Sequence, residues 1–345
     1  MNEMPLISLI IPCYNAKEEW VKRALNSVRN QTYQKYEALV IDDGSRDECH
    51  FILESIVTGD HERLITIDNS GAAEARNTGI RESKGEYVCF LDVDDWLADD
   101  YLERAVMYQQ HSQADMVIGG VAHRDHYDLT ECPIRKAHPD YTCFDRKTMS
   151  SFIPHLLGPE YLLHFEDGDI KRGPVARLVK KELASVILFS PDITIGEDLI
   201  WNINLLSRVQ KVCVARECWY YYWTNPDSVT HKYNEKVFPE LEKHAVELGK
   251  IIDQNDAGTY RSYISHLFEE IRLCWDLCLR KEKKENIEKY KITISEIYQS
   301  VLWKTVCSKK ALQTAPLKRK LIILMCRMKL YFGLYALKDK LRGNF

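Results

Sequence analysis

The stretch "LISLIIPCYNAKEEWVKRALNSVRNQTYQKYEALVIDDGS", residues 6–45, decides the fold. Its opening apolar run, residues 6–12, predicts a short buried strand, and a second run at 36–42 predicts another. Between them, apolar side chains recur at the spacing of one helical face. That face consists of Trp20, Val21, Ala24, Leu25 and Val28. Strand, helix and strand in this order predict a parallel βαβ unit.

The same alternation continues to about residue 120. Further strands are expected at 63–68, 86–92 and 114–120, and further helices up to about 57, at 71–85 and at about 99–112. This rhythm predicts an α/β fold, a Rossmann-like and mostly parallel sheet with helices on both faces. Ligands of such sheets bind beyond the C-terminal strand ends. The segments "PCYN", "DDGS" and "DVDD" all follow expected strands, so we expect them to converge in one crevice.

The second half of the chain changes character. After a less regular part, helices are expected over 145–157 and after Gly196, and a strand over 211–223. From about 235 the pattern is wholly helical. We therefore expect a catalytic α/β domain over 1–232 and an all-helical region over 233–345.

Composition excludes several classes of protein. The chain has 345 residues, 45% of them apolar and 28% charged, which is typical of a soluble globular protein. No apolar run reaches the ~20 residues of a membrane span, and the N-terminus lacks the basic region of a signal peptide. Eleven cysteines without framework spacing favour free thiols in a cytoplasmic protein. The pairs Cys213/Cys218 and Cys274/Cys278 have no partner pair at zinc-site spacing, so core cysteines are favoured.

The charge is distributed unevenly. Residues 308–345 contain ten Lys or Arg and one acid, a local charge of +9, so the remainder carries −4 − 9 = −13. Apolar runs beyond Pro316 are short and interrupted by basic residues. This pattern predicts an in-plane amphipathic helix on an anionic surface, peripheral at the inner face of the cell membrane. The alternatives are packing on the preceding helices or a contact in a homo-oligomer.

Three carboxylates crowd the end of the expected strand at 86–92. Asp92, Asp94 and Asp95 repel one another, and a helix cap needs only one of them. Hard oxygen ligands suit Mg²⁺ or Mn²⁺. Because the chain has no P-loop or Rossmann glycine motif, the ion would have to hold a substrate diphosphate. Asp42 and Asp43 of "DDGS" are read either as a turn cap or as acceptors for a nucleobase or ribose.

Several motifs together resemble a known family. These are residues 8–45, "NSGAAEARNTGI" (69–80) and "GEYVCFLDVDDW" (85–96), followed by "GPVARLVKKEL" (173–183), "IGEDLIWNINLL" (195–206) and "CWYYYWTNPDSVTH" (218–231). They resemble family-2 inverting glycosyltransferases of the GT-A fold. The resemblance is dense over about 5–120, weaker to 230, and absent after about 235. One departure is Arg177, where the family commonly has Lys.

The resemblance implies roles for individual residues. Asp43 would bind the uracil N3–H, Arg76 would approach the nucleotide, and Asn77 would brace the helix that carries it. The implied nucleotide-binding set is Pro12, Tyr14, Asn15, Asp42, Asp43, Arg76 and Asp92. The implied metal ligands are Asp92, Asp94 and Asp95, with no ranking of Asp94 over Asp95. His231 is either a further metal or phosphate contact or an exposed loop histidine.

The catalytic base is implied at the start of a helix. Taken alone, Glu197 and Asp198 are acids in a first helical turn. By resemblance they supply the general base, with Asp198 ahead of Glu197. The implied activity moves a hexose or N-acetylhexosamine from a UDP-sugar to a glycan acceptor, lipid-linked, in surface polysaccharide or capsule synthesis. The alternatives are a nucleotidyltransferase, which would need a glycine-rich loop after the first strand, and a non-catalytic sugar- or partner-binding module.

Overall fold

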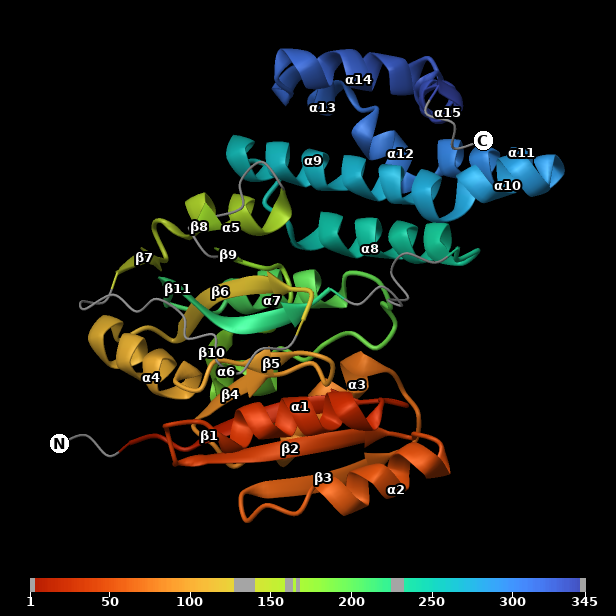
Figure 1. Ribbon diagram of the computed structural model, residues 1–345. Helices are drawn as coiled ribbons and strands as arrows, with labels where there is room; N and C mark the ends of the chain where they lie inside the picture. Colours follow the sequence, from red (N-terminus) through yellow and green to blue (C-terminus); the bar gives the residue numbers. More distant parts are fainter. Residues whose placement is uncertain (1–3, 127–139, 159–163, 166–167, 225–232, 342–345) are drawn as a thin grey trace. The chain divides into compact units, whose positions relative to one another are not determined.

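A computed structural model describes residues 4–126, 140–158, 164–165, 168–224 and 233–341. The chain divides into two compact units, one of residues 1–152 and 162–226 and the other of residues 153–161 and 227–345. The predicted boundary near 232 stays a prediction, because it lies outside the described residues. Each unit is described by itself (Figure 1).

The first unit is built on one sheet. Its strands are β1 (Ile7–Cys13), β2 (Tyr36–Asp43), β3 (Glu62–Ile67), β4 (Tyr87–Phe90), β5 (Trp96–Leu97), β6 (Met116–Arg124), β7 (Tyr141–Asp145), β8 (His164–Phe165), β9 (Gly168–Asp169), β10 (Arg177–Lys180) and β11 (Lys211–Trp223). The main path runs β3-β2-β1-β4-β10-β6-β11-β5. Strand β7 pairs with β11, β9 pairs with β6, and β8 pairs with β9.

The direction of the strands changes at β10. Strands β3, β2, β1 and β4 are parallel, as the βαβ pattern predicts. Strand β10 is antiparallel to both β4 and β6, whereas β11 is parallel to β6. The sheet is therefore parallel over its N-terminal half and mixed beyond it. Strand β10 has four residues and begins soon after Gly173 and Pro174, so it carries too little alternation to be predicted as a strand.

Helices cover both faces of the sheet, as predicted. Those of the first unit are α1 (Glu18–Arg29), α2 (Asp47–Ile56), α3 (Ala72–Glu82), α4 (Tyr101–Ser112), α6 (Lys181–Val186) and α7 (Glu197–Leu206). Side chains of β1 alternate between the faces: Leu9 joins a core with α1, α2 and α4, whereas Ile10 faces α3. A Cβ at Gly79 of α3 would lie 2.3 Å from Ile10 Cγ2, so helix and sheet approach too closely there for a side chain.

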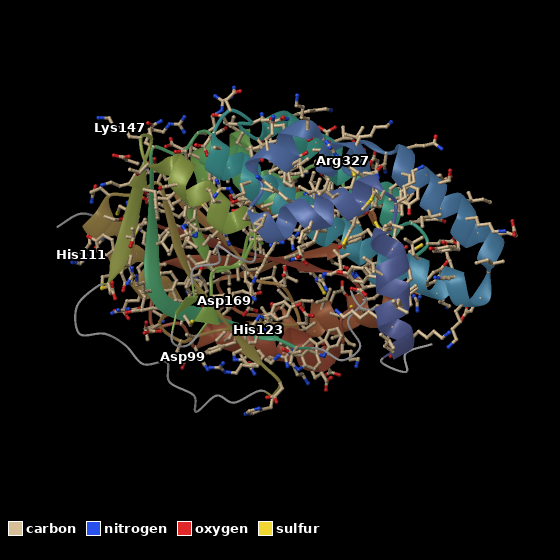
Figure 2. All side chains as sticks on the ribbon, turned by 90° about the horizontal axis from the view of Figure 1, so that it is seen from above. Asp99, His111, His123, Lys147, Asp169 and Arg327 are labelled. Atoms are coloured by element: carbon tan, nitrogen blue, oxygen red, sulfur yellow. The ribbon has the colours of Figure 1, made fainter. Side chains whose placement is uncertain are left out.

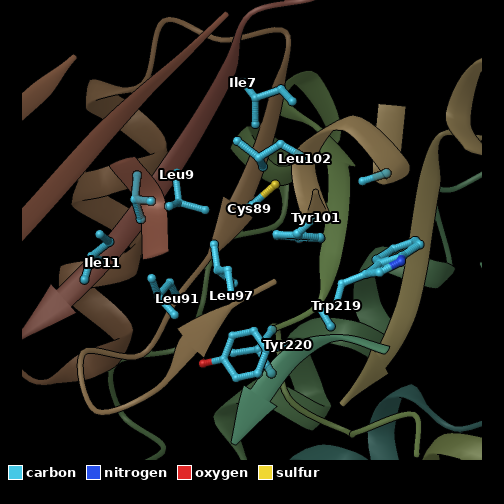
Figure 3. Close-up of a cluster of buried hydrophobic side chains, with 14 of the residues drawn as sticks. Ile7, Leu9, Ile11, Cys89, Leu91, Leu97, Tyr101, Leu102, Trp219 and Tyr220 are labelled. Carbon is cyan, nitrogen blue, oxygen red and sulfur yellow. The ribbon is translucent and has the colours of Figure 1, made fainter. Parts of the chain in front are cut away.

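The core that contains Leu9 extends across the sheet to β11. Figure 3 shows Leu9, Leu91 and Leu97 packed together, with Tyr101, Trp219 and Tyr220 completing the cluster. Trp219 and Tyr220 are fully buried although they are neighbours on one strand. Both side chains belong to the same core cluster. Trp219 Nε1 donates to Glu217 Oε2 at 3.3 Å, whereas the Tyr220 hydroxyl donates to Asp95 in the site described below.

The second unit is helical in its described part, as predicted for the C-terminal region. It contains α8 (Val237–Ile251), α9 (Ala257–Cys274), a π-helix (Trp275–Leu279), α10 (Arg280–Glu285), α11 (Ile287–Gln299), α12 (Val301–Val306), α13 (Lys309–Thr314), α14 (Leu317–Arg327) and α15 (Tyr331–Leu341). Helix α5 (Met149–Leu157) begins in the first unit and ends in the second. Among the described helices, none combines the length and the apolar character that crossing a bilayer requires.

Aromatic side chains form the centre of the second unit. Phe332 of α15 stacks on Trp275 and Trp303, with ring centroids 6.2 and 5.6 Å apart. The buried carboxylate of Asp339, also on α15, accepts hydrogen bonds from Trp275 Nε1 at 2.8 Å and Arg280 Nε at 2.9 Å. One face of α15 is therefore part of the core, which bears on the membrane prediction.

Candidate active site

The first two loops of the site are bonded to each other. Strands β1 and β2 are in register so that Cys13 pairs with Asp42, which brings "PCYN" and "DDGS" to the same sheet edge. Asn15, with a positive φ of 47°, donates its N–H to Ser45 Oγ at 3.0 Å and accepts the Arg46 N–H on Oδ1 at 2.9 Å. Tyr14 is thereby held with its side chain 55% exposed beside this edge.

The two aspartates of "DDGS" are buried and have protein partners. Asp42 accepts the Ser45 N–H at 3.0 Å, and its Oδ2 lies 2.7 Å from His50 Nδ1. Asp43 accepts the backbone N–H groups of Ser70 at 2.7 Å and Gly71 at 2.8 Å. Both roles expected for this motif, a turn cap and an acceptor for the nucleotide, therefore remain open. Asp43 stabilises the N-terminus of α3, and it lies at the strand ends where the nucleotide is predicted to bind.

Arg76 of α3 connects two acidic segments that are far apart in sequence. Its Nη2 donates to Asp92 Oδ1 at 3.0 Å and its Nη1 to Glu197 Oε1 at 3.3 Å. Burial opposes the charge of Arg76, but Asp92, Glu197 and Asp198 together raise its pKa above the usual value. The guanidinium is therefore a fixed positive charge between the "DVDD" loop and the start of α7.

Asn77, the next residue, fixes the helix behind this charge. Its side-chain amide donates to the Phe189 carbonyl at 2.9 Å and accepts the Phe189 N–H at 2.8 Å. Phe189 in turn stacks on Trp201 of α7, with ring centroids 4.6 Å apart. The bracing role that the resemblance implies for Asn77 thus has a definite partner, which also links α3 to α7.

The three acids of "DVDD" have different surroundings. Asp95 is 1% exposed, and its carboxylate accepts the Tyr220 hydroxyl at 2.6 Å and the Trp223 N–H at 2.8 Å. The Tyr220 hydroxyl also accepts the Asp92 N–H at 3.1 Å, so one tyrosine holds both ends of the loop. Within the described residues the Asp94 carboxylate accepts no hydrogen bond from another residue and forms no ion pair, although its carbonyl accepts from Arg23 Nη2 and the charge of Arg23 lies near enough to lower the pKa of that carboxylate.

Electrostatic repulsion is strong in this loop. Burial, and then the charge of Asp92, raise the pKa of Asp94. Burial, Asp92 and Asp94 raise the pKa of Asp95 well above its usual range. Burial and the same three carboxylates raise the pKa of Tyr222. Two guanidinium groups oppose these three carboxylates, Arg76 at Asp92 and Arg23 near Asp94, so the loop keeps an excess of negative charge that suits a cation.

Basic side chains stand on the other side of Tyr222. Its ring meets His123 edge-on at 5.1 Å, and Lys171 contacts His123 Nε2 and lies 3.6 Å from Asp169 Oδ2. Figure 2 shows His123 and Asp169 close to each other at this end of β6 and β9. Burial, and then the charge of Lys171, lower the pKa of His123, so this histidine is neutral near pH 7.

The acids at the start of α7 differ as well. Burial, and then Asp198, raise the pKa of Glu197 to about 7, against the lowering effect of Arg76. Within the described residues the Asp198 carboxylate accepts one hydrogen bond, from the Leu199 N–H at 2.7 Å. Its Oδ2 faces Gly173, where an added Cβ would lie 3.1 Å away. The Asp198 carboxylate is therefore partly exposed and lies close to the backbone of Gly173.

The loop that faces Asp198 is held by Arg177. This arginine is fully buried and donates to the carbonyls of Val175 at 2.8 Å and Lys171 at 2.7 Å. Burial lowers its pKa to about 10, while Asp198 and Tyr101 raise it. The residue that departs from the family's common lysine is therefore a brace for the 171–175 loop, using a fork that a lysine does not have.

The structure places the predicted residues as two adjoining groups at one sheet edge. The first contains Pro12, Tyr14, Asn15, Asp42 and Asp43, and the second contains Arg76, Asp92, Asp94, Asp95, Glu197 and Asp198. His231 lies outside the described residues. Sequence reasoning missed Tyr220, Arg23 and Arg177 as supports, and only the aromatic run at 219–223 gave a local signal for the first of them.

Comparison with known proteins agrees with this arrangement. Residues 8–152 match Glycosyl transferase family 2. An uncharacterized glycosyltransferase of Haemophilus influenzae is 29% identical over 236 residues, which are 63% of this chain and 94% of that protein. The poly(ribitol-phosphate) beta-glucosyltransferase of Bacillus spizizenii is 28% identical over 227 residues, 64% of this chain but only 32% of that longer protein.

A solved structure shares the fold over nearly the whole chain. The crystal structure of Staphylococcus aureus TarS 1–349 in complex with UDP-GlcNAc superposes with a TM-score of 0.67 at 16% identity. The match covers 98% of this chain and 92% of that one. The α/β sheet with a helical C-terminal region, which the motifs predict, is therefore confirmed as a GT-A-like architecture.

Proposed function

Because this chain is a family 2 glycosyltransferase, we propose that it moves a hexose or N-acetylhexosamine from a UDP-sugar to a glycan acceptor, with inversion at the anomeric carbon. The observation that carries the proposal is Arg76, which joins Asp92 to Glu197 in one charged cluster at the predicted nucleotide edge. The UDP-GlcNAc complex of TarS supports a UDP-sugar donor. The name of the Bacillus relative supports a polymer acceptor in surface polysaccharide synthesis.

The nucleotide would lie against the first group of residues. Tyr14 offers an exposed ring to the base. Asp43 Oδ1 keeps a second lone pair beyond its bond to Ser70, whereas Oδ2 accepts from both Gly71 and Asn69 Nδ2. Asp92 is about one-third exposed beside Arg76, which suits a contact with the ribose. The nucleoside would therefore be bound by the Tyr14 ring and by the carboxylates of Asp43 and Asp92, whose positions are fixed by their hydrogen bonds.

The residues present fit a divalent cation. Asp94 offers a carboxylate that accepts no hydrogen bond from another described residue, Asp92 is partly exposed beside it, and both supply the hard oxygen ligands that Mg²⁺ and Mn²⁺ prefer. Asp95 is better suited to a supporting role, because Tyr220 and Trp223 already engage both its oxygens. When bound, the ion would neutralise charge on the departing diphosphate.

The base is assigned to Asp198. Inversion needs one displacement: the acceptor hydroxyl oxygen bonds to the anomeric carbon, its proton passes to a carboxylate, and the electron pair of the broken bond leaves on UDP. Glu197 forms an ion pair with Arg76, whereas Asp198 has no cationic group within 4 Å among the described residues and accepts only the Leu199 N–H. Glu197 would keep Arg76 in place and remains the second candidate for the base.

The two alternatives predict different outcomes. A nucleotidyltransferase would transfer a nucleoside monophosphate from a nucleoside triphosphate to its acceptor and release pyrophosphate, and a binding module would release nothing. Identification as a glycosyltransferase argues against both. The first strand is followed by "PCYN" and not by a glycine-rich loop, which counts further against nucleotidyl transfer.

The proposed chemistry is tested with purified full-length protein and a panel of nucleotide sugars. We expect Mn²⁺-dependent UDP release from at least one UDP-hexose or UDP-N-acetylhexosamine and none from ADP-glucose or GDP-mannose. NMR of the product should show a β-linkage formed from an α-linked donor. Equal release from all nucleotides, or a product of retained configuration, would contradict the proposal.

The C-terminal helices support a peripheral membrane position. Two apolar stripes repeat at the same spacing, one on α14 and one reaching along α15, with side chains 41% to 80% exposed. We call them the leucine face: Leu317, Leu321, Leu324 and Met328, then Leu330, Leu334, Leu337 and Leu341. Lys318, Lys320 and Lys340 lie next to these positions in sequence. The opposite faces pack on the helical core through Ile323 and Phe332.

Packing on the core and contact with lipid are therefore compatible. The leucine face would enter the acyl boundary while the basic side chains reach anionic headgroups, each contributing roughly 1 kcal/mol. A membrane position would bring the site to a lipid-linked acceptor. Deleting the tail would remove Phe332 from the core, so point variants give the cleaner test.

Vesicle binding of the full-length protein tests this part. The double variant Leu321→Ser/Leu324→Ser should lose most of its binding to phosphatidylglycerol vesicles at low salt. Ile292→Ser, which changes an equally exposed apolar residue on α11, is the matched control and should bind like the wild type. Unchanged vesicle binding of the double variant would show that the leucine face does not contact the lipid. Sedimentation would then test whether this face forms a contact between copies of the chain.

A further inference from the structure

Two histidines and a glutamate meet in the interior of the helical unit. His244 belongs to α8, and His266 and Glu270 belong to α9. The spacing of four residues places His266 and Glu270 on one face of α9, directed at α8. All three are buried, with exposed fractions of 1%, 6% and 3%.

Both imidazoles are directed at one carboxylate oxygen. His244 Nδ1 contacts Glu270 Oε1, and His266 Nε2 lies 3.4 Å from the same atom. The rings meet edge-on with centroids 5.4 Å apart. One ligand atom from each of the three residues lies within 4.8 Å of the others, a separation that a single ion can span.

The polar atoms of this cluster are incompletely satisfied. Within the described residues, the buried atoms His244 Nε2 and Glu270 Oε2 have no hydrogen-bond partner. Leaving a buried polar atom unpaired costs about 1–3 kcal/mol, and more for a charged group. Burial raises the pKa of Glu270, but the hydrogen bonds of His244 and His266 lower it below its usual value, so the carboxylate is charged. Packing of an apolar interior alone therefore does not explain a buried, charged glutamate in this place.

We propose that His244, His266 and Glu270 form a binding site for a first-row divalent cation, Zn²⁺ by preference, which fastens α8 to α9. Two imidazoles and one carboxylate are a known donor set for zinc. Two ligands at ~2.05 Å on a tetrahedron lie about 3.3 Å apart, which matches the distance between His266 Nε2 and Glu270 Oε1. The ion would take up the charge of the carboxylate and remove the need for an imidazolium.

This site differs in kind from the acidic loop of the first unit. Asp92 and Asp94 offer oxygen ligands at a partly exposed strand end, which suits an exchangeable Mg²⁺ or Mn²⁺. The buried imidazoles favour a borderline ion that is taken up as the chain folds and is retained afterwards. Its effect is therefore expected on the stability of the helical unit and not on UDP binding.

Elemental analysis of the full-length protein provides the test. The protein is expressed with zinc in the medium and passed over a chelating resin before zinc is counted per chain. We expect about one zinc per chain in the wild type. The same content is expected in Asp94→Asn, which changes the other cation site, and in His111→Gln, which changes an exposed histidine of α4 (Figure 2). Glu270→Gln and His266→Gln should lose at least four-fifths of it.

A second measurement does not depend on variants that fold. Wild-type protein unfolded and refolded with chelator should take up one Co²⁺ with visible absorption bands, and its melting temperature should rise by several degrees when Zn²⁺ is added. Zinc content near zero in the wild type, or no cobalt bands, would overturn the proposal and assign the cluster to a proton shared by two histidines and a glutamate. Equal zinc content in folded Glu270→Gln would overturn it as well.

Discussion

The substitution Tyr220→Phe tests how the acidic loop is held. The hydroxyl is fully buried, donates to Asp95 Oδ2 at 2.6 Å and accepts the Asp92 N–H at 3.1 Å. A hydrogen bond to a charged group contributes about 1.5–3 kcal/mol and a neutral one about 0.5–1.5 kcal/mol, so their sum is roughly 2–4.5 kcal/mol. Because phenylalanine keeps the ring, no packing term is added. We therefore expect unfolding free energy to fall by about 2–4 kcal/mol.

The same change should weaken cation binding. The Tyr220 hydrogen bond lowers the pKa of Asp95 against burial and the charge of Asp92, so its loss raises that pKa further and makes the loop less negative. Urea unfolding followed by tryptophan fluorescence measures the first effect, and the Mn²⁺ concentration for half-maximal UDP release measures the second. Tyr222→Phe, on the same strand but 37% exposed, is the control and should change stability by less than about 0.5 kcal/mol. Equal effects of the two variants would refute the reasoning.

Three further changes test other parts of the molecule. Asp198→Asn should lower turnover by a factor on the order of 10²–10⁴ with little change in UDP-sugar affinity, and an equal loss in affinity would make it a nucleotide ligand. Since burial and Asp198 raise the pKa of Glu197 to about 7, Glu197 takes up a proton below that pH and its ion pair with Arg76 weakens; activity should fall as pH drops through about 7, and Glu197→Gln should move that limb to lower pH. Gly79→Ala should cost roughly 1–3 kcal/mol in thermal unfolding because its Cβ would meet Ile10, whereas Gly333→Ala, with no atom within 4 Å of its Cβ, should not destabilise.

The parts of the fold that were predictable are those with a local pattern. Strands β1, β2 and β4 are apolar runs, and α1 shows a continuous helical stripe, so period alone identifies them. Strand β5 has two residues and exists because Trp96 and Leu97 pair with β11 more than one hundred residues later. Such a strand has no signal in its own sequence. The short β10 was missed for the same reason.

The site was predictable in its charges but not in its supports. Clusters of acids after strands pointed to Asp92 and Asp94, because excess carboxylates at a strand end need a counter-charge. Which acid the protein itself engages depends on Tyr220, 125 positions from Asp95, and no local pattern specifies that contact. Arg177 could be noticed as a departure, but its role as a brace for the 171–175 loop follows only from its burial and its two carbonyl partners.

The C-terminal helices were predicted as helices, but the sequence did not show which of their faces is exposed. The basic and apolar residues after 316 fit both an amphipathic surface helix and a packed one, and the sequence alone did not separate them. In the structure the two sets are divided between faces, with Phe332 and Asp339 inside and the leucine face outside. The helical period separates the two stripes in the sequence, but only the position of the core determines which stripe is buried and which remains exposed.

The central claim is that Asp94 and its neighbours hold a cation needed for transfer from a UDP-sugar. The most direct measurement is the initial rate of UDP release with Mn²⁺ and with chelator, for the wild type, Asp94→Asn and the control Asp99→Asn, which changes an exposed aspartate nearby (Figure 2). The account predicts rates at least a hundredfold lower for the wild type in chelator and for Asp94→Asn in Mn²⁺, with Asp99→Asn active. Full activity of the wild type in chelator, or of Asp94→Asn in Mn²⁺, would contradict it.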